Sequence, residues 1–266
     1  MNSMALFSEK IKSIPGEFAL DQNLTSGAIA QVFLCTFNAA KAVIRIDCPS
    51  ASLLSIDRDK EVKILNTLKN LKLAPKVLYQ DESAGILIWK FIPGIKPSFN
   101  TNNKDHCLKL LGRELSLIHR TSIPDDCSDI FSNSMELYGN LLQDTVYEPL
   151  YKKASSLFKE LYFDETPKVL SHNDLNQDNL LWKNKFYFLD WEYASLNHPC
   201  FDLASLVNTY KLVPSQIHDL SIGYGGDQEL FVMDRLKDWI EFIHYLDVIW
   251  KISVDVISEQ LPNEPD

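Results

Sequence analysis

SHNDLNQDN at residues 171–179 and FLDWE at residues 188–192 are the stretches that decide the fold of this chain. Apolar runs of the kind that form short strands flank them, at residues 168–170, 180–182 and 186–189. The second and third runs are separated by few enough residues for a tight turn. The pattern therefore predicts a polar loop and then a β-hairpin, which returns the second acidic stretch to the side of the loop.

Three residues in these stretches have a spacing that suits one kind of chemistry. Asp174 lies five residues before Asn179, and Asp190 follows Asn179 by eleven residues. In phosphoryl transfer an aspartate must reach the acceptor hydroxyl, while an asparagine oxygen and a second carboxylate hold magnesium at the phosphates. We therefore interpret Asp174 as the catalytic base and Asn179 and Asp190 as Mg²⁺ ligands.

Two other interpretations fit the same loop. A plain polar loop in solvent would place no demand on the spacing of its residues. A hydrolase metal site of histidines and carboxylates would need further His or Asp ligands at close spacing, and none stand out in the sequence.

The chain resembles the choline/ethanolamine kinase, thiamine kinase and aminoglycoside phosphotransferase superfamily in three motifs: HND at 172–174, DWEY at 190–193 and FDLA at 201–204. The DWEY form is closest to bacterial choline kinases and thiamine kinases. The resemblance covers most of the chain and is sharp between residues 168 and 206.

The resemblance implies an α+β, protein-kinase-like fold with two lobes. A small antiparallel β-sheet lobe with one helix, residues 1–92, is expected to bind ATP. A larger, mainly helical lobe, residues 93–266, is expected to hold the catalytic and acceptor-binding residues. Within it, His172 is expected to orient the catalytic loop, Asp202 to tie that loop in place, and His119 to be structural.

The first lobe contains the residues that the resemblance assigns to the ATP phosphates. Residues 31–37 and 42–46 read as a strand pair, and Arg45 is a cation on the otherwise apolar second strand. Residues 57–71 have helical periodicity, with Glu61 on the apolar stripe. The resemblance implies that Arg45 and Glu61 form an ion pair. An edge-strand arginine in water and a solvated helix carboxylate are the alternatives.

The loop expected to cover the nucleotide is residues 24–30, placed before the first strand. It offers Ser26 and Gly27 but lacks the G-x-G-x-x-G and P-loop patterns. A strand at 86–89 leads to Pro-Gly, a turn signal. The kinase analogy makes the intervening residues the hinge that contacts adenine: Lys90, Phe91 and Ile92.

Further helical patterns appear at residues 105–120, 135–161 and 236–254. On the last of these, Asp247 interrupts the apolar face beside Trp250. An aromatic face with a nearby negative charge suits a quaternary ammonium or thiazolium group. We therefore predict that Trp250, Asp247 and Glu192 bind the acceptor, although an aromatic stripe is more often simply core.

Composition narrows the class of protein. The 266 residues carry a formal net charge of −10, which argues against a nucleic-acid partner. No run of eighteen apolar residues predicts a membrane span, and the N-terminus lacks a signal-peptide pattern. Five scattered cysteines fit a reducing cytoplasm: Cys35, Cys48, Cys107, Cys127 and Cys200.

The sequence thus predicts a cytoplasmic kinase that uses ATP and Mg²⁺ to phosphorylate a hydroxyl of a small cationic molecule such as choline or thiamine. The alternatives are an aminoglycoside phosphotransferase, a non-catalytic nucleotide-binding pseudokinase and a protein kinase. The missing glycine-rich loop and the absence of an A-P-E segment weigh against a protein kinase.

Overall fold

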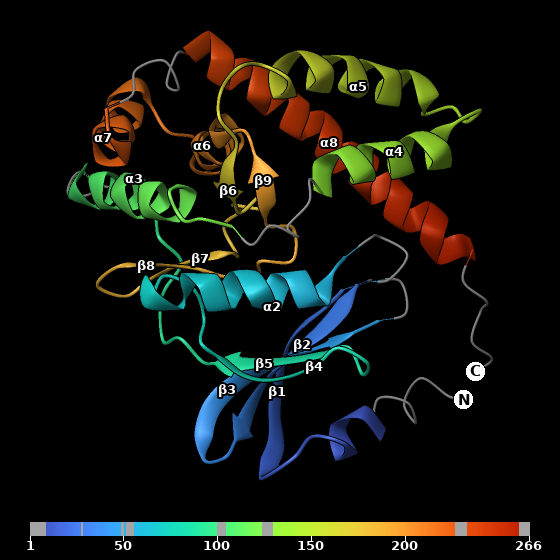
Figure 1. Cartoon of the computed structure of the whole chain (residues 1–266), viewed down its shortest axis with the longest axis vertical. Helices are drawn as coiled ribbons and strands as arrows, with labels where there is room; N and C mark the ends of the chain where they lie inside the picture. The colour runs from blue at the N-terminus through green and yellow to red at the C-terminus, as the bar shows by residue number, and fades with distance from the viewer. Residues whose placement is uncertain are drawn as a thin grey trace. The chain divides into compact units, whose positions relative to one another are not determined.

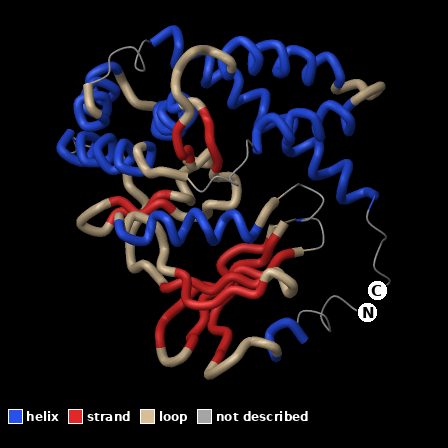
Figure 2. The backbone as a smooth tube through the Cα atoms, in the orientation of Figure 1, coloured by secondary structure: helices blue, strands red, loops and turns tan. Residues whose placement is uncertain are grey.

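The protein is described by a computed structural model, shown in Figure 1, over residues 9–27, 29–48, 51, 56–99, 105–123, 130–226 and 233–260. It divides into two compact units. Unit one comprises Met1–Asp59, Pro75–Ile92 and Val254–Asp266, and unit two comprises Lys60–Ala74 and Pro93–Ser253. Strands dominate the described part of unit one and helices that of unit two, as Figure 2 shows. The expected assignment of ATP binding to 1–92 and of acceptor binding to 93–266 stays a prediction.

Unit one is built on a five-stranded antiparallel sheet with the order β1-β2-β3-β5-β4. Its strands are β1 (Phe18–Ser26), β2 (Ala30–Phe37), β3 (Ala40–Asp47), β4 (Val77–Asp81) and β5 (Ile86–Lys90). The three predicted strands correspond to β2, β3 and β5 and are confirmed. The placement of the covering loop before the first strand is wrong, because residues 24–26 belong to β1.

The core of unit one explains why β3 can hold a cation. Ala42, Ile44 and Ile46 lie on one face of β3 and join the apolar cluster of the sheet. Val43 and Arg45 lie on the opposite face and are also buried. Since β3 is flanked by β2 and β5, Arg45 is on a central strand and only 4% exposed. The edge-strand arginine in water is therefore excluded.

Unit two contains most of the helices and two short strand pairs. Its helices are α3 (Asp105–His119), α4 (Ile130–Leu142), α5 (Glu148–Tyr162), α6 (Pro199–Tyr210), α7 (Pro214–Tyr224) and α8 (Met233–Gln260), the last extending into unit one. Helix α2 (Arg58–Thr67), followed by the short η2 (Leu68–Asn70), begins in unit one and continues in unit two. Strand β6 (Val169–Ser171) pairs with β9 (Ser195–Asn197), and β7 (Leu180–Trp182) pairs with β8 (Phe186–Phe188).

The helical pattern predicted as one segment over 135–161 is two helices. Asp144 has φ 59°, in the left-handed region that ends helices, and the next helix begins with Pro149 in its first turn. No described helix combines the length and the apolar character that crossing a membrane requires.

Helices α3 and α7 approach closely because glycines face the opposite backbone at their crossing. A Cβ atom on Gly112 would lie 2.2 Å from the Leu220 carbonyl oxygen, and one on Gly223 would lie 2.0 Å from that of Lys109. The close approach brings His119, the last residue of α3, against Tyr224, the last residue of α7. This packing positions His119 for the site described below.

Candidate catalytic site

The predicted loop and hairpin are confirmed, and both lie in unit two. Strand β6 ends at Ser171 and is followed by the polar loop, and β7 pairs antiparallel with β8 from Leu180↔Phe188. The Leu189 N–H donates to the Asn179 carbonyl at 2.8 Å, which extends the pairing by one step. Asp190 therefore leaves the hairpin beside Asn179, as the spacing predicted.

Asp174 is held by two asparagines from its own loop. The amide nitrogen of Asn179 donates to Asp174 Oδ2 at 2.6 Å and to the Asp174 carbonyl at 2.9 Å. Asn176 donates to Asp174 Oδ1 at 3.0 Å. Both carboxylate oxygens are thus oriented before any ligand binds. The nitrogen of Asn179 is engaged, so its amide oxygen is the atom left for a metal.

The electrostatic surroundings of Asp174 are unfavourable for its charge. Burial raises the pKa of Asp174 to about 8, and the negative charges of Asp190 and Glu192 add to the rise. The hydrogen bonds from Asn176 and Asn179 lower it. Three carboxylates therefore share one small region, where a bound cation would relieve their repulsion.

His172 joins the loop to the segment that carries Asp190. It is fully buried, and its Nε2 donates to the Leu189 carbonyl at 2.7 Å. Its ring also packs on Trp191, with centroids 4.6 Å apart. Burial lowers the pKa of His172, so the ring is a neutral connector.

Asp202 fixes the backbone of the loop from the first turn of α6. Its carboxylate accepts from the N–H of His172 at 2.7 Å and from the N–H of Asn173 at 2.9 Å. It also contacts His119 Nε2 at 3.1 Å, and His119 Nδ1 contacts the Tyr224 hydroxyl at 2.6 Å. Burial opposes the charge of Asp202, but the His119 contacts and the other hydrogen bonds lower its pKa below the ordinary value.

Two of the predicted acceptor residues lie near a tight turn at residues 191–194, closed by a bond from the Ala194 N–H to the Trp191 carbonyl. Glu192 occupies this turn next to Tyr193. Trp250 of α8 donates its indole N–H to the Tyr193 hydroxyl at 3.1 Å. Glu192 and Tyr193 lie within electrostatic reach of Asp174, and Trp250 is joined to them through the Tyr193 hydroxyl.

Asp247, the third predicted acceptor residue, is exposed on α8. Partial desolvation raises the pKa of the Asp247 carboxyl above its ordinary value, and the positive charges of Lys251 and His244 oppose this rise. The described contacts do not place it with Glu192 and Trp250, and its assignment to the acceptor stays a prediction.

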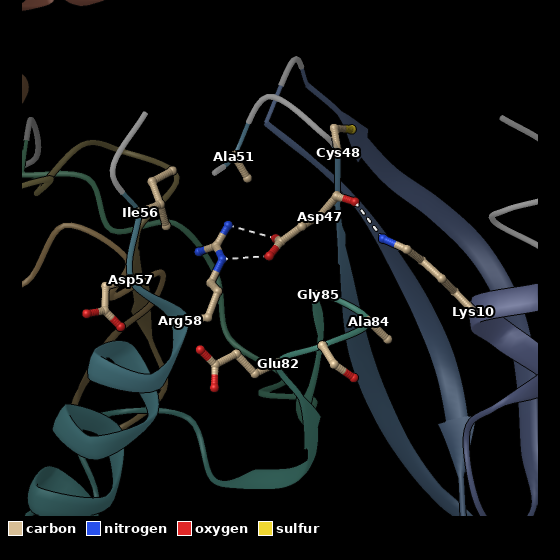
Figure 3. A pocket seen from close by; sticks show the side chains of 11 residues that line it. Lys10, Asp47, Cys48, Ala51, Ile56, Asp57, Arg58, Glu82, Ala84 and Gly85 are labelled. Atoms are coloured by element: carbon tan, nitrogen blue, oxygen red, sulfur yellow. Dashed lines mark hydrogen bonds and ion pairs between the residues drawn. The ribbon is translucent and has the colours of Figure 1, made fainter. Parts of the chain in front are cut away.

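Arg45 has a partner that the sequence did not suggest. The Nε atom of Arg45 lies 3.5 Å from Asp47 Oδ1. Arg58 donates to the same carboxylate from Nε at 2.8 Å and from Nη2 at 2.7 Å (Figure 3). Glu61 belongs to unit two and is 2% exposed, and its charge raises the pKa of His172 against the larger effect of burial. The ion pair expected between Arg45 and Glu61 stays a prediction.

Figure 3 shows a cavity of about 580 Å³ around Asp47, formed within unit one. The Lys10 ammonium donates to the Asp47 carbonyl at its rim. Glu82 and Ala84, from the β4–β5 turn, line another side. No local pattern predicts this cavity, since Lys10, Asp47 and Glu82, which line it, are far apart along the chain.

The other residues expected to bind ATP are partly occupied by bonds inside unit one. Gly27 donates its N–H to the Ala30 carbonyl, and the Ser26 hydroxyl accepts from Asn23. The N–H groups at the expected hinge bond to neighbouring backbone: Lys90 to Lys76 at 2.9 Å and Phe91 to Lys41 at 3.1 Å. The expected contact of Lys90, Phe91 and Ile92 with adenine stays a prediction.

Sequence reasoning missed several residues that hold the site together. Asn173 is the most connected of them, with side-chain bonds to Tyr193, Ser195 and Asn197. Its place between His172 and Asp174 was the available signal, but nothing local indicates partners twenty residues later.

Comparison with known proteins identifies relatives of this chain. It is similar to the Protein LicA homolog of Mycoplasma capricolum, at 22% identity over 184 residues, which cover 69% of this chain and 73% of that protein. It is also similar to ethanolamine kinase 2 of Mus musculus, at 26% identity over 174 residues, which cover 59% of this chain and 44% of that protein.

The fold is similar to that of the choline kinase LicA from Streptococcus pneumoniae, with a TM-score of 0.74 at 21% identity over 99% of this chain and 93% of that one. A structure of LicA in complex with AMP gives a TM-score of 0.75 at 20% identity, covering 99% and 94% of the two chains. The α+β, protein-kinase-like fold is confirmed by this similarity, and the predicted superfamily by the curated relatives together with the family match over residues 22–239. Residues 22–239, most of the chain, match the phosphotransferase enzyme family, and the chain therefore belongs to that family.

Proposed function

We propose that this phosphotransferase moves the γ-phosphate of ATP to the hydroxyl of a small cationic alcohol, with choline as the first candidate. The observation that carries the proposal is the setting of Asp174. Its carboxylate is oriented by Asn179 and lies within electrostatic reach of both Asp190 and Glu192. A base, a pair of metal ligands and a negative charge for a cation are thereby gathered in one region.

The residues present fit Mg²⁺. Asn179 has its amide oxygen left over, and Asp190 offers an exposed carboxylate at the end of the hairpin. Magnesium prefers oxygen ligands and is held in kinases by few protein groups, with phosphate oxygens completing the set. When bound, Mg²⁺ would neutralise the charge that develops on the phosphates.

In this proposal the chain's own residues mainly position the reactants. Asp174 accepts a hydrogen bond from the acceptor hydroxyl, aims its oxygen at the phosphorus, and takes the proton. His172 and Asp202 keep the loop rigid through their bonds to Leu189 and to the loop backbone. Positioning of this kind accounts for a large share of the rate in phosphoryl transfer.

The acceptor's cation is assigned to Glu192, Tyr193 and Trp250, with Asp247 as a further charge. Aromatic faces with a nearby carboxylate stabilise a quaternary ammonium group. The bond between Trp250 and Tyr193 fixes the two rings relative to one another. Choline is favoured by its quaternary nitrogen and by the similarity to a choline kinase, and ethanolamine is the second candidate because of the ethanolamine kinase relative.

ATP as the phosphate donor is supported by the AMP complex of LicA. Within unit one, we assign Arg45, Ser26 and Gly27 to the phosphates and Ile92 to adenine. Arg45 is suited to phosphate because its guanidinium is always charged and is already oriented by Asp47.

The proposal is tested by ATP consumption with choline, ethanolamine, thiamine and an aminoglycoside as separate acceptors. We expect turnover with choline, weaker turnover with ethanolamine, and loss of about a thousandfold in Asp174→Ala, equivalent to roughly 4 kcal/mol of transition-state stabilisation. The matched control is Asp178→Ala, an exposed aspartate of the same loop, which should retain full activity.

The possible outcomes distinguish the proposed function from the alternative functions. Turnover on the aminoglycoside alone would identify a resistance enzyme in place of a choline kinase. Nucleotide binding without turnover on any alcohol would support a pseudokinase. Full activity in Asp174→Ala would refute the assignment of the base.

A further inference from the structure

We propose that Asn173 is a positioning residue that holds the acceptor turn, residues 191–194, in register with Asp174. The inference rests on the proposed function, and it assigns to Asn173 the role of keeping the acceptor-binding residues in place relative to Asp174. It concerns contacts within unit two alone.

The side chain of Asn173 makes three hydrogen bonds. One is to Tyr193 in the turn, and the other two are to Ser195 and Asn197 in β9, the strand that follows the turn. Its amide nitrogen donates to the Tyr193 carbonyl at 2.8 Å and to the Ser195 hydroxyl at 2.9 Å. Its amide oxygen accepts from the Asn197 side chain at 2.8 Å. One side chain thus ties the loop to both ends of a five-residue stretch.

The strand pairing explains why this one residue can reach the turn. Strand β6 runs into the catalytic loop and β9 leaves the acceptor turn, and the two are antiparallel with Ser171 opposite Ser195 (Figure 1). The exit of one strand and the entry of the other therefore lie side by side. Asn173, two residues beyond the end of β6, spans this end of the sheet.

The backbone at Asn173 restricts which residue can do this. Its φ is 66°, in the left-handed region that asparagine and glycine tolerate best. Its N–H is fixed by Asp202 at 2.9 Å, and its side chain is 8% exposed. An amide that both donates and accepts is required here, because two partners are acceptors and the third is a donor.

The contacts continue from the turn to the proposed acceptor residues. Tyr193, whose carbonyl is held by Asn173, accepts the indole N–H of Trp250 through its hydroxyl, and Glu192 is the preceding residue. On the other side, Asn173 is bonded covalently to Asp174. Asn173 therefore sets the distance between the base and the groups that hold the acceptor's cation.

The test compares two identical substitutions at backbones of the same kind. Asn173→Gly keeps the left-handed backbone and removes all three side-chain bonds. Asn184→Gly, in the exposed β7–β8 turn with φ 63°, is the matched control. We expect Asn173→Gly to lower kcat/KM for the acceptor about tenfold to a hundredfold, the scale of a small misplacement, with KM for ATP changed less than twofold. Asn184→Gly should change neither.

The inference is wrong if Asn173→Gly leaves kcat/KM for the acceptor unchanged, or if KM for ATP rises by the same factor. Should Asn173→Gly fail to fold, Ser195→Ala takes its place, because it removes one of the three bonds of the Asn173 side chain and buries no charge. We then expect kcat/KM for the acceptor to fall at least about twofold with KM for ATP unchanged, and an unchanged kcat/KM for the acceptor would contradict the inference.

A second readout separates this inference from the proposed function. Hydrogen exchange of residues 191–197 should be at least tenfold faster in Asn173→Gly than in Asn184→Gly, without any substrate. Wild-type protein inactive on every alcohol would refute the proposed function only. Unchanged exchange together with an unchanged acceptor kcat/KM would refute the positioning role only.

Discussion

The catalytic loop of unit two and the Asp47 cluster of unit one, defined as Arg45, Asp47 and Arg58, both hold charged groups in place, but by different means. In the loop, the buried carboxylate of Asp202 accepts two backbone N–H groups, and the amide of Asn179 donates to the Asp174 carboxylate. In the cluster, two arginines share one carboxylate, and Asp47 is still 12% exposed. The loop is therefore held by many separate bonds from several residues, and the cluster by one carboxylate that two arginines share.

The largest expected effect is at Asp190, where a substitution should lower activity strongly and change the free energy of unfolding little. Asp190→Gly removes a proposed Mg²⁺ ligand from an exposed position and keeps the left-handed backbone, φ 59°, so activity should fall about a thousandfold while stability changes by less than about 1 kcal/mol. Steady-state kinetics and urea unfolding measure the two quantities. An activity within tenfold of wild type would remove Asp190 from the metal site.

Asp202→Ala tests the directional bonds of the loop. The substitution leaves two buried N–H groups and His119 without their shared acceptor, so we expect the free energy of unfolding to fall by about 3 kcal/mol or more. The control is Asp234→Ala on the exposed first turn of α8, with a change of less than about 0.5 kcal/mol in urea unfolding. Equal effects at the two positions would mean that the loop is not held from α6.

The pH dependence of stability tests another directional bond of unit two. His198 caps α6 by accepting the Cys200 N–H at Nδ1, and burial, together with the charge of Lys168, lowers its pKa to about 4. Its Nε2 faces Asp164 and Arg235, which already pair with one another.

Because the unfolded histidine has a pKa near 6.5, the unfolded state binds more protons between pH 6.5 and 4. The stabilisation from His198 is therefore complete above pH 6.5 and is lost as the pH falls towards 4, by roughly 3 kcal/mol at most. Urea unfolding from pH 7 to 4.5 should show a shallower loss in His198→Gln than in wild type. An equal slope in the two proteins would show that His198 does not contribute.

The smallest expected effect is in unit one. Asp47→Ala removes the carboxylate shared by Arg45 and Arg58, whose side chains are largely buried. We expect KM for ATP to rise about tenfold and the free energy of unfolding to fall by about 2 kcal/mol, less than for a buried charge left wholly unpaired, because each arginine keeps a further interaction. Glu82→Ala, an exposed acid lining the same cavity, is the control and should change neither. A stability loss as large as that of Asp202→Ala would abolish the contrast between the two regions.

The catalytic loop could be predicted from sequence because its main contacts are local. Asp174 and Asn179 are five residues apart, and the hairpin that returns Asp190 is short and apolar. The three predicted strands of the sheet were recognisable for the same reason, since short runs of apolar residues mark them directly.

The rest depends on contacts that leave no local pattern. Strand β1 was missed because its residues are mostly polar and exposed, so it lacks the alternation of a half-buried strand. The partners of Asn173 lie about twenty residues later, and His119 reaches Asp202 across 83 positions. The pairing of Arg58 with Asp47 was likewise not predicted, because it joins the start of α2 to the end of β3.

The central claim is that Asp174 is the base for phosphate transfer to choline. The most direct test follows phosphocholine formation from ATP and choline by ³¹P NMR in wild type, Asp174→Asn and Asp178→Asn. We predict phosphocholine at equal rates in wild type and Asp178→Asn, and a rate about a thousandfold lower in Asp174→Asn. Phosphocholine formed by Asp174→Asn at the wild-type rate would contradict the account.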